Sequence, residues 1–148
     1  MAESLELQTL TIRCPSCSRK GAVPLSAALP RPSCPGCGDS LPLHRPIDVA
    51  EADFTSTVLR APVPVLVDFY ASWCAPCRWL DPILEGLAAQ WRGRVLVTKV
   101  DTEEAPRVTE DQKVGSVPTV VLFRDGIEVG RSIGVEPDVL NDLVEGVA

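Results

Sequence analysis

The stretch VDFYASWCAPC, residues 67–77, carries the features that decide the fold. It overlaps the end of an apolar, β-branched run over residues 63–70. It then opens a segment over residues 76–91, whose apolar side chains from Trp79 onward recur at the spacing of one helix face. The run predicts a buried strand, and the segment predicts a helix with an internal proline that should kink it. The two cysteines of the stretch therefore lie where a strand gives way to a helix.

These two cysteines, Cys74 and Cys77, are placed for redox chemistry. A sulfur near a helix N-terminus meets unpaired N–H groups and the positive end of the helix dipole, which favour the thiolate over the thiol. Pro76 fits the first helical turn, where its missing N–H costs nothing. Cys77 follows one turn later, so its sulfur can reach the first and close a disulfide. We interpret the pair as a dithiol switch; the alternative is a pair of buried, unreactive cysteines.

The chain from Ile47 onward predicts an α/β fold. Its expected order β-α-β-α-β-β-α implies a mixed sheet covered by helices on both faces. The dipeptide Asp125-Gly126 signals a hairpin between the last two strands. The expected elements are strands over residues 63–70, 95–100, 118–123 and 127–133, and helices over residues 51–60, 76–91, 103–113 and 137–147.

The first part of the chain has a different composition. Residues 1–46 hold seven of the fourteen prolines and four of the six cysteines, with little helical or strand periodicity. Their few apolar side chains cannot build a core alone, and a segment this small usually needs a staple. We therefore expect two parts, a small module over residues 1–46 and a domain over residues 47–148.

The four N-terminal cysteines have the spacing of a zinc site. They form two C-x2-C pairs in coil rich in proline and glycine, with sixteen residues between the pairs. Zn²⁺ prefers four soft ligands in a tetrahedron, and two tight turns can each supply two thiolates. We expect one structural Zn²⁺ per chain, held by Cys14, Cys17, Cys34 and Cys37. Two disulfides or reactive free thiols are the alternatives, and the only histidine, His44, is expected to be an ordinary surface residue.

Composition and charge exclude several classes of function. The 148 residues include 45% apolar and 23% charged side chains, which is a globular composition. The longest apolar run stops at Asp68 and is too short to cross a bilayer. The N-terminus does not resemble a secretory signal, so we expect a cytoplasmic protein. The net charge is −6, and no basic stripe is present, so nucleic acid is a poor partner.

From Ile47 to Ala148 the sequence resembles the thioredoxin family. The resemblance implies a thioredoxin fold, and it rests on several separate motifs in the family's order. These are residues 67–77, Pro82, and residues 97–101, 115–119, 123–126 and 134. The double C-x2-C before them resembles the zinc-ribbon-bearing bacterial thioredoxin 2 type.

This resemblance implies a reaction and a role for each matching residue. Cys74 would attack a protein disulfide, and Cys77 would resolve the mixed disulfide. Asp68 would be a buried acid–base group for Cys77, and Lys99 its partner; a water-facing aspartate and a plain surface lysine are the alternatives. The electrons would come from an NADPH-dependent thioredoxin reductase, and no organic cofactor would be bound.

The resemblance also implies a surface for the substrate. Pro118 would be a cis-proline, with an ordinary trans proline as the alternative, and the Val117 backbone would pair with an extended substrate segment. The expected substrate-binding residues are Trp73, Ala75, Pro76, Val117, Pro118 and Gly134. Ala75 departs from the family's usual glycine, which bears on the redox potential but not on the type of reaction.

Other functions remain open at this level. The dithiol could work in the opposite direction, as an oxidase or isomerase of disulfides. The N-terminal module could bind a partner, or could sense oxidants by releasing its metal. We expect a monomer that reduces protein disulfides.

Overall fold

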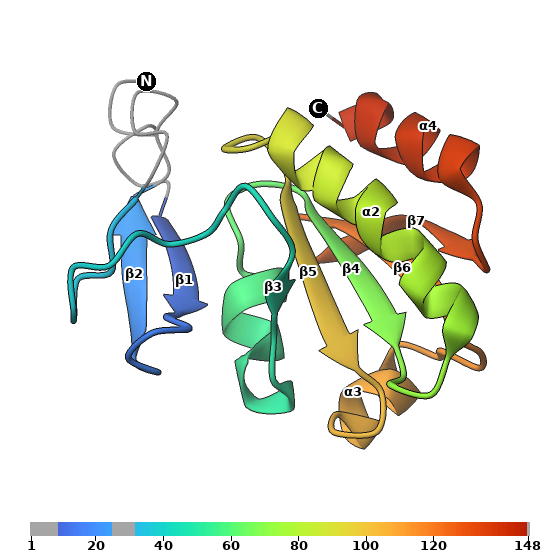
Figure 1. Cartoon of the computed structure of the whole chain (residues 1–148), viewed down its shortest axis with the longest axis horizontal. Helices are drawn as coiled ribbons and strands as arrows, with labels where there is room; N and C mark the ends of the chain where they lie inside the picture. Colours follow the sequence, from blue (N-terminus) through green and yellow to red (C-terminus); the bar gives the residue numbers. More distant parts are fainter. Residues whose placement is uncertain (1–8, 25–31, 148) are drawn as a thin grey trace.

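The computed structural model describes residues 9–24 and 32–147, and Figure 1 shows the arrangement of their elements. The strands are β1 (Thr9–Arg13), β2 (Lys20–Pro24), β3 (Ile47–Asp48), β4 (Val65–Tyr70), β5 (Leu96–Asp101), β6 (Thr119–Arg124) and β7 (Ile127–Ile133). The helices are the 3-10 turn η1 (Glu51–Asp53), the π-helical η2 (Phe54–Leu59), α2 (Ala75–Gln90), α3 (Pro106–Asp111) and α4 (Pro137–Val147).

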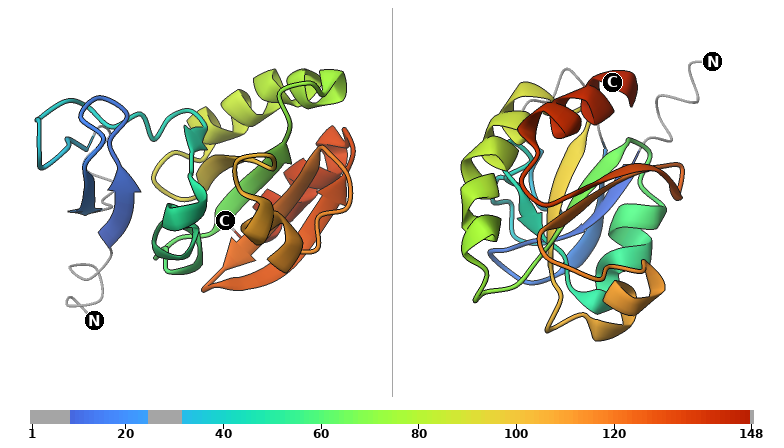
Figure 2. Two further views of the ribbon diagram at one scale, coloured as in Figure 1. Left: turned by 90° about the horizontal axis from the view of Figure 1, so that it is seen from below. Right: turned by 90° about the vertical axis from the view of Figure 1, so that its right-hand side faces the viewer.

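The main sheet is mixed and has helices on both faces, as the sequence predicts. Its strand order is β3-β5-β4-β6-β7, in which β3, β5 and β4 are parallel while β6 and β7 run antiparallel to their neighbours. Helices α2 and α4 pack on one face with the apolar side chains of one core cluster, and η2 and α3 pack on the other face with a second cluster. Figure 2 shows this layering along the sheet.

The side chains of β4 alternate between the two faces. Val67 and Phe69 belong to the cluster that contains η2, where the Phe69 and Phe54 rings lie 6.3 Å apart between centroids. Leu66 points to the α2 face, and its place two residues before Asp68 puts that carboxyl on the same face. A strand buried on both faces therefore carries an ionisable carboxyl group toward α2.

The β6–β7 hairpin confirms the Asp125-Gly126 signal. Both residues have positive φ, 53° and 77°, as a type I′ turn requires. Gly126 also lies against η2, because a Cβ at this position would come within 2.8 Å of the Leu59 carbonyl oxygen. The turn therefore requires glycine for two reasons.

The N-terminal segment contains structure that the sequence analysis did not predict. β1 and β2 form an antiparallel hairpin around the first cysteine pair, and Ser33 and Ser40 form a single bridge around the second. Each strand has only five residues. The alternation of buried and exposed side chains is therefore carried by Leu10, Ile12 and Val23 alone, which is too few residues for a strand to be recognised in the sequence.

Two other expectations differ from the structure. The single helix predicted over residues 51–60 is a 3-10 turn followed by a π-helical turn. The helix predicted over residues 103–113 begins only at Pro106, a residue suited to the first turn of a helix. Within residues 9–24 and 32–147, no helix combines the length and the apolar character needed to cross a membrane.

Candidate active site and metal centre

The Cys74–Cys77 pair lies at the N-terminus of α2, directly after β4 and a short turn. Cys74 is the N-cap residue with extended backbone angles, φ −89° and ψ 109°, and its sulfur accepts the backbone N–H of Cys77 at 3.2 Å. A disulfide joins the two residues, whose Cα atoms are 5.4 Å apart. Both cysteines are buried, whereas the Trp73 side chain beside them is 71% exposed.

The loop before β6 packs against this dithiol. The Val117–Pro118 peptide is cis, which confirms the expected conformation. Val117 packs against a small cluster that contains Ala71 and the two cysteines. The N–H of Gly134 donates to the Pro118 carbonyl at 2.8 Å, so the end of β7 joins the same neighbourhood.

The other two residues expected to bind substrate lie within the turn itself. Ala75 is exposed and Pro76 is half-buried at the start of α2. Trp79, which the helical spacing allowed in the core or on the helix surface, is 65% exposed and therefore lies on the surface. The buried face of α2 is instead formed by Leu80, Leu84 and Leu87.

Asp68 is fully buried on the α2 face of β4. Neither of its carboxyl oxygens has a hydrogen-bond partner among the residues that the structure describes. Burial raises the pKa of this carboxyl to about 7; the positive charge of Lys99 lowers it, and the negative charge of Asp81 raises it further. The group can therefore gain or lose a proton near neutral pH.

Lys99 stands beside Asp68 in the sheet but bonds elsewhere. The two residues are paired across β5 and β4. The Lys99 ammonium, however, contacts Asp81 Oδ1 at 2.8 Å and lies 4.5 Å from the centroid of the Tyr70 ring. Sequence reasoning missed Asp81, although its position four residues after Cys77 puts both on one side of α2.

The four N-terminal cysteines come together as the spacing predicts. Their sulfurs all lie within 4.8 Å of one another, and the closest pairs are Cys14–Cys37 at 3.7 Å and Cys17–Cys34 at 3.6 Å. Four Zn–S bonds of about 2.3 Å in a tetrahedron would place the sulfurs about 3.8 Å apart. The donor set and its spacing therefore fit a metal ion that prefers tetrahedral thiolate ligands.

Two matching turns present these sulfurs. Each begins with a cysteine whose carbonyl accepts an N–H four residues later, from Ser18 in the first turn and Gly38 in the second. Both of these residues have positive φ, 63° and 81°. The exposed His44 lies outside the sulfur group.

The Cys34 and Cys37 thiols differ in how readily they ionise. Backbone N–H groups of Cys37 and Gly36 lower the pKa of the Cys34 thiol to about 6, against the effect of burial. The Asp39 N–H also favours the Cys37 thiolate, but burial and the three neighbouring sulfurs raise the pKa of Cys37 to about 12. A divalent cation would remove this opposition, because it neutralises the charge that the thiolates accumulate.

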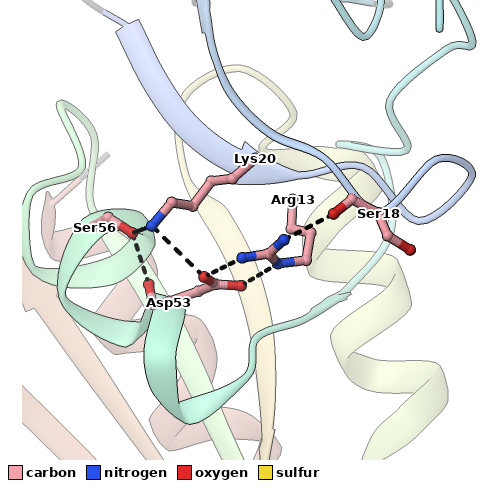
Figure 3. Close-up of polar contacts among 5 residues, drawn as sticks. All are labelled: Arg13, Ser18, Lys20, Asp53 and Ser56. Carbon is pink, nitrogen blue, oxygen red and sulfur yellow. Dashed lines mark hydrogen bonds and ion pairs between the residues drawn. The ribbon is translucent and has the colours of Figure 1, made fainter. Parts of the chain in front are cut away.

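An ion-pair cluster connects the β1–β2 hairpin, which carries two of the four N-terminal cysteines in its loop, to η1 and η2 (Figure 3). Arg13 donates two hydrogen bonds to the buried carboxylate of Asp53, at 2.8 and 2.9 Å, and a third to the Ser18 carbonyl at 2.7 Å. Lys20 lies 3.7 Å from the same carboxylate and 3.4 Å from Ser56 Oγ. The pKa of Asp53 is lowered, chiefly by the Arg13 hydrogen bonds.

Comparison with known proteins decides the family. The family profile described as Thioredoxin matches residues 45–146, about two thirds of the chain. The chain belongs to the thioredoxin family. It is a thiol-disulfide oxidoreductase, because the Cys74–Cys77 pair occupies the active-site position of that family.

Individual thioredoxins give the same result. Thioredoxin 1 from Nostoc sp. is 40% identical over 89 residues, which cover 60% of this chain and 83% of the relative. A bifunctional thioredoxin reductase/thioredoxin from Mycobacterium leprae is 40% identical over 103 residues, covering 68% of this chain and 22% of that protein. The solved structure of a mutant thioredoxin from Halobacterium salinarum superposes with a TM-score of 0.64 at 36% identity, covering 71% of this chain and 92% of that one.

Proposed function

We propose that the chain reduces disulfide bonds of other proteins, with Cys74 as the attacking thiolate and Cys77 as the resolving thiol. The observation that carries this proposal is the place of the Cys74 sulfur, which accepts an N–H from the first turn of α2. A donor and a helix dipole at this position stabilise negative charge on the sulfur. The sulfur of Cys77 accepts no such N–H in the described part of the chain.

The reaction balances in two exchange steps. The Cys74 thiolate attacks one sulfur of the substrate disulfide, forms a mixed disulfide and releases the other substrate sulfur as a thiolate. Cys77 then loses its proton and attacks the Cys74 sulfur, which breaks the bond to the substrate and forms the Cys74–Cys77 disulfide. The dithiol gives two electrons to the substrate; counted from the two protonated thiols, it also loses two protons, which the two substrate thiolates take up from solvent.

Asp68 is the proposed acceptor of the Cys77 proton. A base works best when its pKa lies near the working pH, and that of Asp68 is about 7. Lys99 is the proposed partner that moderates this basicity, since its charge favours the carboxylate. Both roles follow from the family resemblance and are supported by the buried position of Asp68 on the α2 face.

The proposed substrate surface surrounds the dithiol. Val117 and Pro118 would offer backbone to an extended substrate segment, and the exposed Trp73 would cover its side chains. Ala75, Pro76 and Gly134 complete the surface from the α2 turn and the end of β7. All of these residues come from one chain, which supports action as a monomer.

The N-terminal segment is proposed to be a zinc ribbon of the thioredoxin 2 type. Residues 1–46 would form this module, and residues 47–148 the thioredoxin domain. Zinc is favoured over other metals because four thiolates in a compact tetrahedral arrangement are its usual structural site. Cys14, Cys17, Cys34 and Cys37 would hold the ion, which would join the two turns and stabilise a segment with few apolar residues of its own.

A thioredoxin reductase is the proposed electron donor. The Mycobacterium leprae relative unites a reductase and a thioredoxin in one protein. The proposed compartment is the cytoplasm, where free thiols of the kind that bind metal are kept reduced.

Reduction of insulin disulfides tests the function. With a dithiol reductant in excess, the wild-type chain should accelerate insulin precipitation, and Cys74→Ser should abolish that acceleration. Cys77→Ser should accumulate a covalent adduct with the substrate, detectable as a mass increase that a reductant removes. The metal content of both variants should match the wild type, which controls for folding. Wild-type rates from Cys74→Ser would contradict the proposal.

A further inference from the structure

The carboxylate of Asp81 binds the ammonium group of Lys99, the residue that lies in register with Asp68 in the sheet. Lys99 is paired with Asp68 across the sheet, yet its Nζ bonds to Asp81 Oδ1 at 2.8 Å. The Asp68 oxygens are left without a hydrogen-bond partner among the described residues, although the side chain is fully buried. The lysine ammonium therefore bonds to Asp81, the less buried of the two carboxyl groups.

The position of Asp81 connects this ion pair to the reaction. Asp81 follows Cys77 by four residues on α2, so the two share one side of the helix, and this helix packs on the face of β4 that carries Asp68. The Tyr70 ring lies beneath the Lys99 ammonium at 4.5 Å and helps to hold it at this place.

We propose that Asp81 is a positioning residue for the resolving step: it holds the Lys99 ammonium in an ion pair, and so leaves Asp68 basic enough to take the Cys77 proton. This inference rests on the proposed role of Asp68. It adds a residue of this chain that acts through Lys99 and touches neither the substrate nor the sulfurs.

The surroundings of Asp68 support this assignment from every neighbouring element. On β5 the only charged neighbour in register is Lys99, and on β6 the residue in register is the apolar Val120. β3 adds Asp48, which is exposed and in register with Lys99. On β4 itself, burial raises the pKa of Tyr70 to about 12, so it stays neutral in the working range.

On α2, Asp81 lies about one turn after Cys77, and its negative charge is one cause that raises the pKa of Asp68. Removal of the negative charge of Asp81 would lower the pKa of Asp68. Release of Lys99 toward Asp68 would lower it further. Both would favour the Asp68 carboxylate and weaken it as a base.

The test is the titration of the Asp68 carboxyl carbon by NMR in the oxidised protein, in which the two active-site thiols do not titrate. Asp81→Asn should move the Asp68 midpoint down by about one pH unit. Asp81→Glu should keep the wild-type midpoint. Glu85→Gln, which removes the same charge one turn further along the exposed side of α2, should leave it unchanged.

A double-variant cycle then asks whether Asp81 acts through Lys99. In a Lys99→Gln background, Asp81→Asn should shift the midpoint by clearly less than in the wild type. An equal shift in both backgrounds would overturn the positioning role, because Asp81 would then act only as a direct charge. No shift, or an upward shift, in the wild-type background would also overturn it.

Kinetics supply a second readout. When a chromogenic aromatic thiol is attached to Cys74 as a mixed disulfide, its release reports the attack by Cys77. For Asp81→Asn the rising limb of the pH profile should move to lower pH, and the plateau should fall about threefold because the base is weaker. A wild-type profile for this variant would refute the inference. Failure of the wild-type chain to release the thiol would instead refute the proposed function, while the carboxyl titration would still decide the role of Asp81.

Discussion

Substitution of Asp68 by asparagine should change how the stability of the protein depends on pH. The carboxyl is fully buried, and its pKa rises from 3.8 to about 7 on folding. Between these two values the folded chain binds more protons than the unfolded chain, so stability falls as the pH rises. This decline in stability ends once the pH has passed the folded-state pKa of about 7. The asparagine side chain does not titrate, so the variant should lack this slope.

The size of the change in stability follows from the pKa shift of Asp68 on folding. About three pH units at 1.36 kcal/mol each correspond to about 4 kcal/mol at high pH. Part of this cost is already present at pH 5, because unfolded Asp68 is ionised there. The stability advantage of Asp68→Asn over the wild type should therefore grow by about 2.5 kcal/mol between pH 5 and pH 8.

Urea unfolding of the oxidised protein at a series of pH values measures this difference directly. A difference in unfolding free energy between Asp68→Asn and the wild type that is the same at every pH does not affect the result. The test uses only how that difference changes with pH. Asp142→Asn, on the exposed side of α4, is the matched control and should run parallel to the wild type. Parallel curves for Asp68→Asn and the wild type from pH 5 to pH 8 would refute the reasoning.

Three further predictions concern other parts of the chain. Cys34→Ser should lower the bound zinc well below one per chain, as measured by elemental analysis after dialysis, because three thiolates do not complete the tetrahedron. Arg13→Met should lower the melting temperature more than Lys20→Met, because Arg13 makes the two short bonds to the buried carboxylate and Lys20 only a contact at 3.7 Å. Gly126→Ala should destabilise the protein by about 1–3 kcal/mol in urea unfolding, since it adds a Cβ at positive φ against a backbone carbonyl. Gly86→Ala, in open space on α2, should be neutral or stabilise by up to about 1 kcal/mol.

The dithiol and the sheet around it could be predicted from the sequence because their signals are local. The turn from β4 into α2 is encoded by a β-branched run, a cysteine at the N-cap and a proline in the first turn. The helix over residues 137–147 was predicted at its observed bounds, since its apolar spacing is regular and a proline begins it. The clustering of the four N-terminal cysteines was predictable for a similar reason, because metal-site spacing is a sequence pattern.

The remaining features depend on contacts between distant residues. Arg13 and Asp53 are forty positions apart, and no periodicity connects them. The partner of Lys99 is decided by which of two carboxylates its flexible side chain reaches, and the strand pattern shows only that Asp68 is its neighbour. The exposure of Trp79 has a comparable cause, because a helix buries only the arc that meets the sheet and its neighbouring helix.

The hairpin of the N-terminal segment shares its core with the domain that follows. Leu10, Ile12 and Val23 belong to the same cluster as Phe54 and Val58 of η2, and β1 contacts this helix. The segment is therefore poorly suited to transfer by recombination. A thioredoxin that acquired only the four cysteines would have the candidate metal ligands but would lack the η2 surface against which the hairpin packs. Substitutions on η2 and on the hairpin should therefore be coupled in their effect on stability, because the two surfaces share one core.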